Sequence, residues 1–147
     1  MNPPDDKGHK QDPVPVVLEP SARMKQLIET SHSISVDKNI PLSKYFHSGR
    51  ELIKSATDSE SKGDIEKAFV LYLRYMTLFL EKLIHHPEWS KAERSEKELV
   101  KKQCNDIFEL AEDLKKRILE NYAKEYQDYL IKTKDSHGES ASDITEW

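Results

Sequence analysis

Apolar residues recur through the middle of this 147-residue chain at spacings of three and four, the period of a helix with one buried face. Four segments carry this pattern. The first is short, with Met24, Leu27 and Ile28 forming a narrow apolar stripe behind Pro20, a residue suited to a first helical turn. This helix is expected to end by Ser33, where a polar link begins.

The second segment opens at Pro41 and has one apolar face that includes a glycine. Its face consists of Leu42, Tyr45, Phe46, Gly49, Leu52, Ile53 and Ala56. Glycine inside a helix costs about 1 kcal/mol relative to alanine. The position of Gly49 on the buried face therefore predicts the close approach of another helix. The segment is expected to end at Gly63, a natural C-terminal cap.

The third segment follows at once, with Asp64 as the expected N-cap. The helical segment should extend to the pair His85-His86 and stop before Pro87. A proline disfavours helical conformation in the residue that precedes it, so the helix should end there. Apolar residues cover more than half of its circumference, whereas a surface helix needs a stripe of only about 100°. The sequence therefore predicts a central helix with neighbours on at least two sides.

The fourth segment is the longest, expected from Lys91 to about Lys132, with Ser90 as N-cap and Glu93 completing a capping box. Its apolar residues step by four and three, as in the seam of a coiled coil. The seam consists of Val100, Cys104, Ile107, Ala111, Leu114 and Ile118. Such a helix would be roughly 60 Å long at about 1.5 Å per residue, so its end should project or pack on another chain.

Two aromatic features of this region each have two interpretations. Beyond the seam, Tyr122, Tyr126 and Tyr129 either pack within the chain or form a docking and dimer seam. Trp89, at the turn between the third and fourth helices, is either a core residue or a recognition residue. Aromatic residues at helix turns usually pack, so we expect Trp89 in the core.

The flanking segments lack the helical period. Residues 1–18 contain four of the seven prolines, and residues 133–147 are mostly polar, so we expect a disordered leader and a disordered tail. Between them, residues 19–132 are expected to form one all-α domain. Charged residues make up 34% of the chain and hydrophobic residues 36%, a balance typical of amphipathic helices.

The charge pattern and the cysteine content exclude several classes of function. The net charge is −4 and basic residues are interleaved with acidic ones, which predicts no binding to nucleic acid. No apolar run approaches the roughly 20 residues of a membrane span, and the N-terminus lacks a signal peptide. We therefore expect a cytoplasmic chain without direct membrane insertion. The lone Cys104 suits a reducing compartment and, on the seam, is expected to be a small buried residue.

The sequence offers no candidate for catalysis, cofactor binding or metal binding. Its six histidines are scattered, and no metal-ligand spacing joins them to each other or to the cysteine. His85 and His86 stand where a helix ends, and there an imidazole commonly contacts terminal carbonyl groups. No nucleophile motif and no phosphate-binding loop is present. We expect an interaction module, with no enzymatic activity in this chain.

Two stretches are more specific than the helical period. They are residues 44–53, KYFHSGRELI, and residues 62–83, KGDIEKAFVLYLRYMTLFLEKL. Together they closely resemble the N-terminal domain of the AMSH, or STAM-binding-protein, family of endosomal deubiquitinases. A similar domain of an endosomal ubiquitin-specific protease is called the dimerisation domain, and the wider relation is to three-helix MIT domains. The resemblance covers about residues 34–130 and implies an MIT-like antiparallel bundle with a short N-terminal and a long C-terminal helix.

The chain also departs from the family pattern. Ile84 follows the E-K-L motif where the family usually has proline, and Trp89 stands where it tends to have tyrosine. AMSH proteins carry a C-terminal zinc-dependent JAMM domain whose H-x-H motif this sequence lacks. The chain is therefore either part of a longer zinc-dependent deubiquitinase or a stand-alone adaptor.

The resemblance implies a partner and a place of action. Domains of this family bind the C-terminal helical tails of ESCRT-III subunits, the charged multivesicular body proteins, and so recruit the enzyme to endosomes. Helical spacing selects exposed positions of the third helix as the rim of such a site, or as plain solvated charges. These partner-binding candidates are Lys67, Arg74, Glu81 and Lys82. The alternative function is homodimerisation through the long C-terminal helix.

Overall fold

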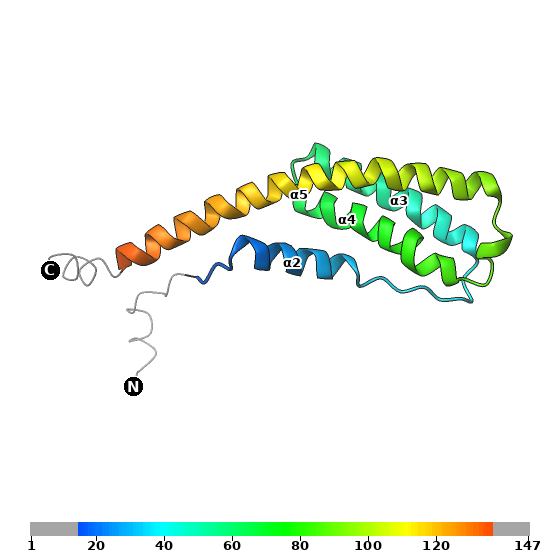
Figure 1. Cartoon of the computed structure of the whole chain (residues 1–147), viewed down its shortest axis with the longest axis horizontal. Helices are drawn as coiled ribbons and strands as arrows, with labels where there is room; N and C mark the ends of the chain where they lie inside the picture. The colour runs from blue at the N-terminus through cyan, green and yellow to red at the C-terminus, as the bar shows by residue number, and fades with distance from the viewer. Residues whose placement is uncertain (1–14, 137–147) are drawn as a thin grey trace, which may run out of the picture.

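The computed structural model describes residues 15–136, and all regular structure in that range is helical (Figure 1). The elements are α2 (Pro20–Ser31), α3 (Leu42–Ser61), α4 (Ile65–Thr77), η1 (Leu78–Lys82), η2 (Leu83–His85), η3 (Trp89–Lys91) and α5 (Arg94–Ser136). The predicted all-α bundle with a short first and a long last helix is confirmed. None of the described helices is both long and apolar enough for a membrane span.

The ends of the domain follow the expected boundaries only in part. Most of the expected leader and tail, residues 1–14 and 137–147, lies outside the described residues. Residues 15–19 have no regular structure, and α2 begins at Pro20 as predicted. At the other end α5 continues past Lys132 to Ser136, so the first residues assigned to the tail are helical.

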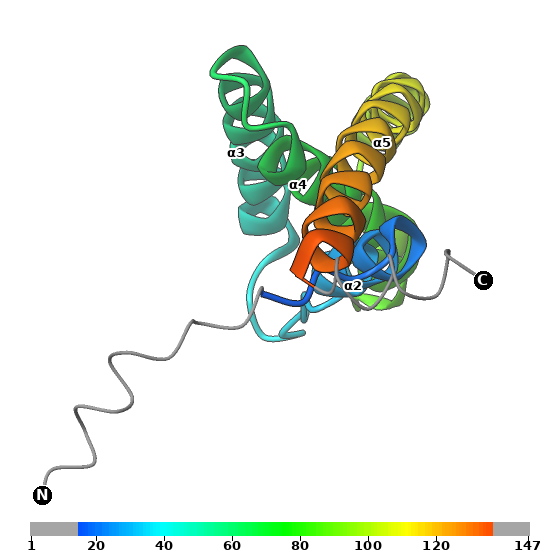
Figure 2. The same ribbon diagram turned by 90° about the vertical axis from the view of Figure 1, so that its left-hand side faces the viewer.

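Helix α4 is the centre of the bundle, as its broad apolar surface predicted. It lies between α3 and α5, and α2 packs against both α4 and α5 (Figures 1 and 2). Beyond α3 and α4, α5 continues as a projecting helix (Figure 1). The predicted seam is confirmed, because all six of its residues are buried.

A tight turn joins α3 to α4. Gly63 has φ of 84°, and its N–H donates to the Glu60 carbonyl at 3.0 Å, while the Asp64 N–H donates to the Ser59 carbonyl at 2.9 Å. This is the Schellman motif, in which glycine adopts the left-handed conformation at no steric cost. The Asp64 carboxylate then accepts the Lys67 N–H at 3.2 Å. The predicted caps at Gly63 and Asp64 are confirmed.

At Gly49, α3 comes close to the rings of Tyr75 at the end of α4 and Phe79 in η1. A Cβ atom at this position would lie 2.5 Å from Cε2 of Phe79. The Phe79 ring is itself confined, with Phe46 at 5.7 Å and Tyr75 at 4.5 Å between ring centroids. The predicted close approach at Gly49 is confirmed.

The third segment is helical to His85, but its winding differs from the predicted continuous α-helix. After Thr77 it widens into the π-helical turn η1 and then tightens into the 3₁₀ turn η2. The Leu83 N–H bonds to the Leu78 carbonyl, five residues earlier. A π-turn stacks residues i and i+5, whereas an α-helix would rotate them well apart. Leu78 and Leu83 therefore both reach the core, where they are 1% and 0% exposed.

The prediction that Ser90 caps the fourth helix is wrong. Ser90 lies in the short turn η3, Ala92 is extended, and α5 begins only at Arg94. The reason is a contact distant in sequence: the Glu88 carboxylate accepts the Leu42 N–H at the start of α3 at 2.9 Å. The loop that contains Glu88 therefore serves as the cap of α3, and α5 starts only after this loop.

His86 and Trp89 hold the same loop in place. His86 is buried, with Nε2 2.8 Å from the Ile40 carbonyl, and its Nδ1 accepts the Glu88 N–H at 3.0 Å. This pattern places the imidazole proton on Nε2, which donates to the carbonyl. The Trp89 indole stacks on the ring of Phe46 with 6.2 Å between centroids. Trp89 thus packs against the core, as expected.

Candidate functional site

An apolar groove runs along the surface between α4–η1 and α5. It consists of two adjoining hollows of about 270 and 430 Å³, which share Met76, Leu80 and Phe108. We call it the α4–α5 groove. Its apolar lining is Ile28, Phe69, Leu73, Met76, Phe79, Leu80, Ile84, Trp89, Val100, Phe108 and Ala111.

Large apolar side chains are left open to solvent along this groove. Leu80 is 53% exposed, Ile84 46% and Phe108 58%. Single exposed apolar residues are common on proteins, but a contiguous row beside a hollow marks an interaction site. Both walls contribute to this set, because Leu80 and Ile84 come from the end of the α4 segment and Phe108 comes from α5. The groove therefore has the form of a site for an amphipathic helix.

The charged side chains on the rim differ between its two ends. Near α2 the lining residues include Glu81, Glu112 and Lys115. Near Trp89 the charged lining residues are Lys97 and Lys101. The end at α2 therefore carries an excess of negative charge, and the end at Trp89 carries positive charge alone.

Helix α2 closes one end of the groove. Ile28 of α2 and His32, the residue directly after this helix, belong to the lining, and His32 Nδ1 lies 3.3 Å from the hydroxyl of the buried Thr77 on α4. Met24 of α2 is buried in the core.

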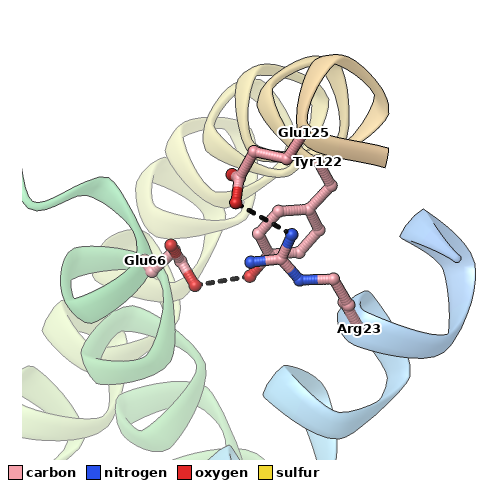
Figure 3. A network of polar contacts seen from close by, with 4 residues as sticks. All are labelled: Arg23, Glu66, Tyr122 and Glu125. Carbon is pink, nitrogen blue, oxygen red and sulfur yellow. Dashed lines mark hydrogen bonds and ion pairs between the residues drawn. The ribbon is translucent and has the colours of Figure 1, made fainter. Parts of the chain in front are cut away.

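A polar cluster clamps α2 onto α4 and α5 (Figure 3). The Arg23 guanidinium lies 3.7 Å from the centroid of the Tyr122 ring, and its Nη1 is 3.2 Å from Glu125 Oε1. The Tyr122 hydroxyl donates a short hydrogen bond to Glu66 on α4. Burial, with a further contribution from the Glu66 carboxylate, raises the pKa of the Tyr122 hydroxyl above its usual value of 10.0. We call these four residues the Arg23 clamp.

The four partner-binding candidates selected by helical spacing do not form one rim. Glu81 lines the groove. Lys67 and Lys82 are exposed but are absent from its lining. Arg74 is only partly exposed, and its Nε atom is buried without a hydrogen-bond partner among the described residues.

The structure divides the proposed tyrosine seam. Tyr122 is 2% exposed and belongs to the Arg23 clamp, so it packs within the chain. Tyr126 and Tyr129 remain partly exposed, with 6.0 Å between their ring centroids. They are followed by the exposed Leu130 and Ile131. Of the proposed seam, the outer part with Tyr126 and Tyr129 is therefore the part open to another chain.

Sequence reasoning missed Phe108, Lys97 and Lys101 as lining residues of the groove. The signal for Phe108 was present, because it is a large apolar residue directly beside the seam residue Ile107. The two lysines are four residues apart and so share a face of α5. No feature of the neighbouring sequence distinguishes these two lysines from the other lysines of α5. They line the groove because α4 packs beside this part of α5.

The thiol of Cys104 lies beside the apolar groove in an environment that disfavours its charged form. Burial raises the pKa of the Cys104 thiol, at the base of the groove, to about 11. Such a thiol is almost wholly protonated near neutral pH, and the thiolate is the reactive form. Within residues 15–136, no group of three His, Cys, Asp or Glu side chains has the arrangement of a metal site.

Several known proteins are similar to this chain. Residues 16–125 match the family described as the USP8 dimerisation domain. The STAM-binding protein of Rattus norvegicus is 39% identical over 134 residues, which cover 90% of this chain and 32% of that protein. The STAM-binding protein-like of Xenopus laevis is 41% identical, with coverages of 76% and 27%. The AMSH-like protease of Homo sapiens is 35% identical, with coverages of 81% and 28%. The chain spans less than a third of the length of each of these relatives.

Proposed function

This chain belongs to the family of the USP8 dimerisation domain, and on that premise we propose that it is a non-catalytic adaptor that docks partner helices in its α4–α5 groove. The resemblance to the AMSH and STAM-binding-protein family is confirmed by the relatives. The observation that carries the proposal is the row of exposed apolar side chains along the groove, Leu80, Ile84 and Phe108. The adaptor would belong to an AMSH-like zinc-dependent deubiquitinase whose catalytic domain lies elsewhere.

The partners we propose are the C-terminal helices of ESCRT-III subunits, which would recruit the protein to endosomes. An amphipathic helix places apolar residues at i, i+3, i+4 and i+7 into such a groove, and polar residues at its edges. Of the rim residues expected from the sequence, we place Glu81 at the interface, because it lines the groove.

Peptides of the ESCRT-III tails test this function. We expect saturable binding to the domain that Phe108→Ala weakens about tenfold or more, since a central aromatic contact is commonly worth about 2 kcal/mol. The matched control is Leu110→Ala, an exposed residue two positions further along α5 that is absent from the groove lining. We expect it to bind like the wild type. Failure of every tail to bind, or equal weakening in both variants, would refute the proposal.

A second function, homodimerisation, is favoured by the projecting end of α5. This end of α5 lies away from α3 and α4 (Figure 1). Its apolar surface comes from the partly exposed Tyr126 and Tyr129 and the exposed Leu130 and Ile131. A helix with such a surface can pair with a second copy of itself. The name of the family points in the same direction. The mass of the chain in solution, followed with concentration, tests this second function.

A further inference from the structure

We propose that the chain has a second binding surface, which takes an acidic segment of a partner protein. This segment places an aliphatic side chain in a hollow between α3 and the link that precedes it, residues 32–41, and a carboxylate on Arg74. The surface is separate from the α4–α5 groove, so the two can be occupied at the same time.

The hollow has a volume of about 350 Å³, which is within the range of about 300–1,000 Å³ for ligand sites. We call it the α3–link hollow. Its lining includes Ile34 of the link, Leu78 of η1, and Tyr45, Ser48, Leu52 and Ser55 of α3. None of the lining residues belongs to α5 or to the α4–α5 groove. The exposed serines are small and stand beside larger apolar side chains, which leaves room for an aliphatic side chain of a partner.

The wall that the link forms is fixed in place without a partner. The Tyr45 hydroxyl accepts the Asp37 N–H at 2.6 Å, and Asp37 Oδ1 accepts the Asn39 N–H at 2.8 Å. The carbonyl of Ile40, the next residue, lies 2.8 Å from Nε2 of the buried His86. Because this wall is already ordered, a partner binds without the entropy cost of ordering it.

A cation without a partner stands beside the α3–link hollow. Arg74 lies four residues before the lining residue Leu78, so the two share a face of the segment that runs from α4 into η1. Arg74 is partly buried, and its Nε has no hydrogen-bond partner among the described residues. None of the ion pairs within residues 15–136 includes it. Partial burial of a guanidinium is unfavourable unless an anion pairs with it, so this position is suited to a carboxylate.

The charges around Arg74 also favour an anion. Lys67 lies two helical turns earlier on the same face of α4, is exposed, and takes part in none of the ion pairs of the described chain. No carboxylate lies one turn before or after Arg74, where the residues are Val70, Leu71, Thr77 and Leu78. The lining of the hollow includes one carboxylate, Glu51 of α3. The two cations outnumber it, and an acidic segment complements this excess of positive charge.

Synthetic peptides test the chemistry of the partner. The probe is a short peptide with two adjacent leucines flanked by glutamates. In one comparison peptide lysines replace the glutamates, and in another serines replace the leucines. We expect the probe to shift the amide NMR signals of Ser48, Leu52 and Ser55 saturably, and both comparison peptides to bind there about tenfold or more weakly. Phe108→Ala, which alters the α4–α5 groove, should leave binding at these signals unchanged.

Replacement of single arginines tests the position of the carboxylate. We expect Arg74→Gln to weaken binding of the probe about fivefold or more at low salt. The matched control is Arg50→Gln, at an exposed position of α3 outside the lining of the hollow, with the same change in net charge. A loss of about twofold or less is expected there, from long-range electrostatics alone.

A stability measurement separates a binding role of Arg74 from a structural one. Arg74→Met keeps a long side chain but removes the unpaired charge. Without peptide, its melting temperature should therefore equal or exceed that of the wild type, while binding of the probe is lost. A clearly lower melting temperature would show that the guanidinium holds the fold together and would overturn its role in binding.

Three further results would overturn the second surface. They are a probe that shifts none of the signals of the α3–link hollow, equal binding of the glutamate and lysine peptides, and equal losses in Arg74→Gln and Arg50→Gln. Signals of the hollow that shift with protein concentration alone would also overturn it, because a second copy of the chain would then be the occupant. Each of these results leaves docking in the α4–α5 groove standing, since that groove is tested at Phe108.

Discussion

Tyr122 lies between two charges of opposite sign, with the Arg23 guanidinium over its ring and the Glu66 carboxylate at its hydroxyl. The ring is buried, so the hydroxyl must have a partner, and a carboxylate acceptor makes the stronger kind of hydrogen bond. Three helices thus meet at one side chain. The sequence could predict that Tyr122 continues an apolar seam. It could not predict the clamp, because Arg23 is 102 residues from Glu125.

Replacing Tyr122 by phenylalanine tests the clamp. The variant keeps the ring under Arg23 but leaves the Glu66 carboxylate without its donor. We expect it to lower the free energy of unfolding at pH 7 by about 1–2 kcal/mol, measured by chemical denaturation. Tyr126→Phe is the control, since Tyr126 is partly exposed and outside the clamp, and it should change stability by less than about 0.5 kcal/mol.

The same pair of variants should differ at alkaline pH. The folded-state pKa of Tyr122 is raised above 10.0 and that of Cys104 from 9.0 to about 11. The unfolded chain therefore loses these protons first. Stability is fully present below about pH 9 and falls as the pH rises above it. Tyr122→Phe should show a smaller fall between pH 9 and pH 11 than the wild type; an equal fall would contradict the raised pKa.

At the scale of the elements, the features that could be predicted were those that depend on residues close together in the sequence. Gly63 and Asp64 mark the α3–α4 turn by their own conformational preferences, so the caps were readable from the sequence. The start of α5 could not be read from the sequence. It depends on the Glu88 carboxylate, which accepts a hydrogen bond from the N–H of Leu42, 46 residues away. The π-turn was also unpredictable, since it depends on where the core requires Leu78 and Leu83. The groove could not be predicted for the same reason. Its apolar residues can be found in the sequence, but only the packing of α4 against α5 brings them together.

The pairing of α3 with α4 can be tested at Gly49. Alanine would favour the helix by about 1 kcal/mol, but its Cβ would clash with the confined Phe79 ring, and overpacking costs about 1–3 kcal/mol. We expect Gly49→Ala to lower the melting temperature. Ser55→Ala, at an exposed position of the same helix, should leave it equal or slightly raised. A stabilised Gly49→Ala would show that the two helices are further apart than described.

At the scale of the whole molecule, the bundle and the projecting part of α5 separate two surfaces. The groove lies on the bundle, whereas the exposed Leu130 and Ile131 lie near the end of α5. A helical partner and a second copy of the chain could therefore bind at the same time. The sequence predicted a projecting helix from its length alone. It grouped Tyr122 with Tyr126 and Tyr129 in one stripe, because periodicity does not show which of these residues α2 covers.

This separation predicts the oligomeric behaviour of two variants. If the end of α5 pairs two copies, the mass from light scattering should rise from 17.1 kDa towards twice that value with concentration. Ile131→Asp should return it to the monomer, because burial of a new charge at the pairing surface is unfavourable. Leu110→Asp, an equally drastic change at an exposed position on the bundle, should not. A monomer mass for the wild type at every concentration would remove the dimer.

The Schellman turn between α3 and α4 also bears on the order in which the chain folds. Pairing these helices closes a loop of three residues, whereas the Arg23–Glu125 contact closes one of about a hundred. Loop-closure entropy grows as (3/2)RT ln n, so the second closure costs about 3 kcal/mol more. The α3–α4 hairpin is thus the natural nucleus. Of the described helices, α2 is the first to leave the ribosome during synthesis, and its contacts with α5 can form only after α5 has been made.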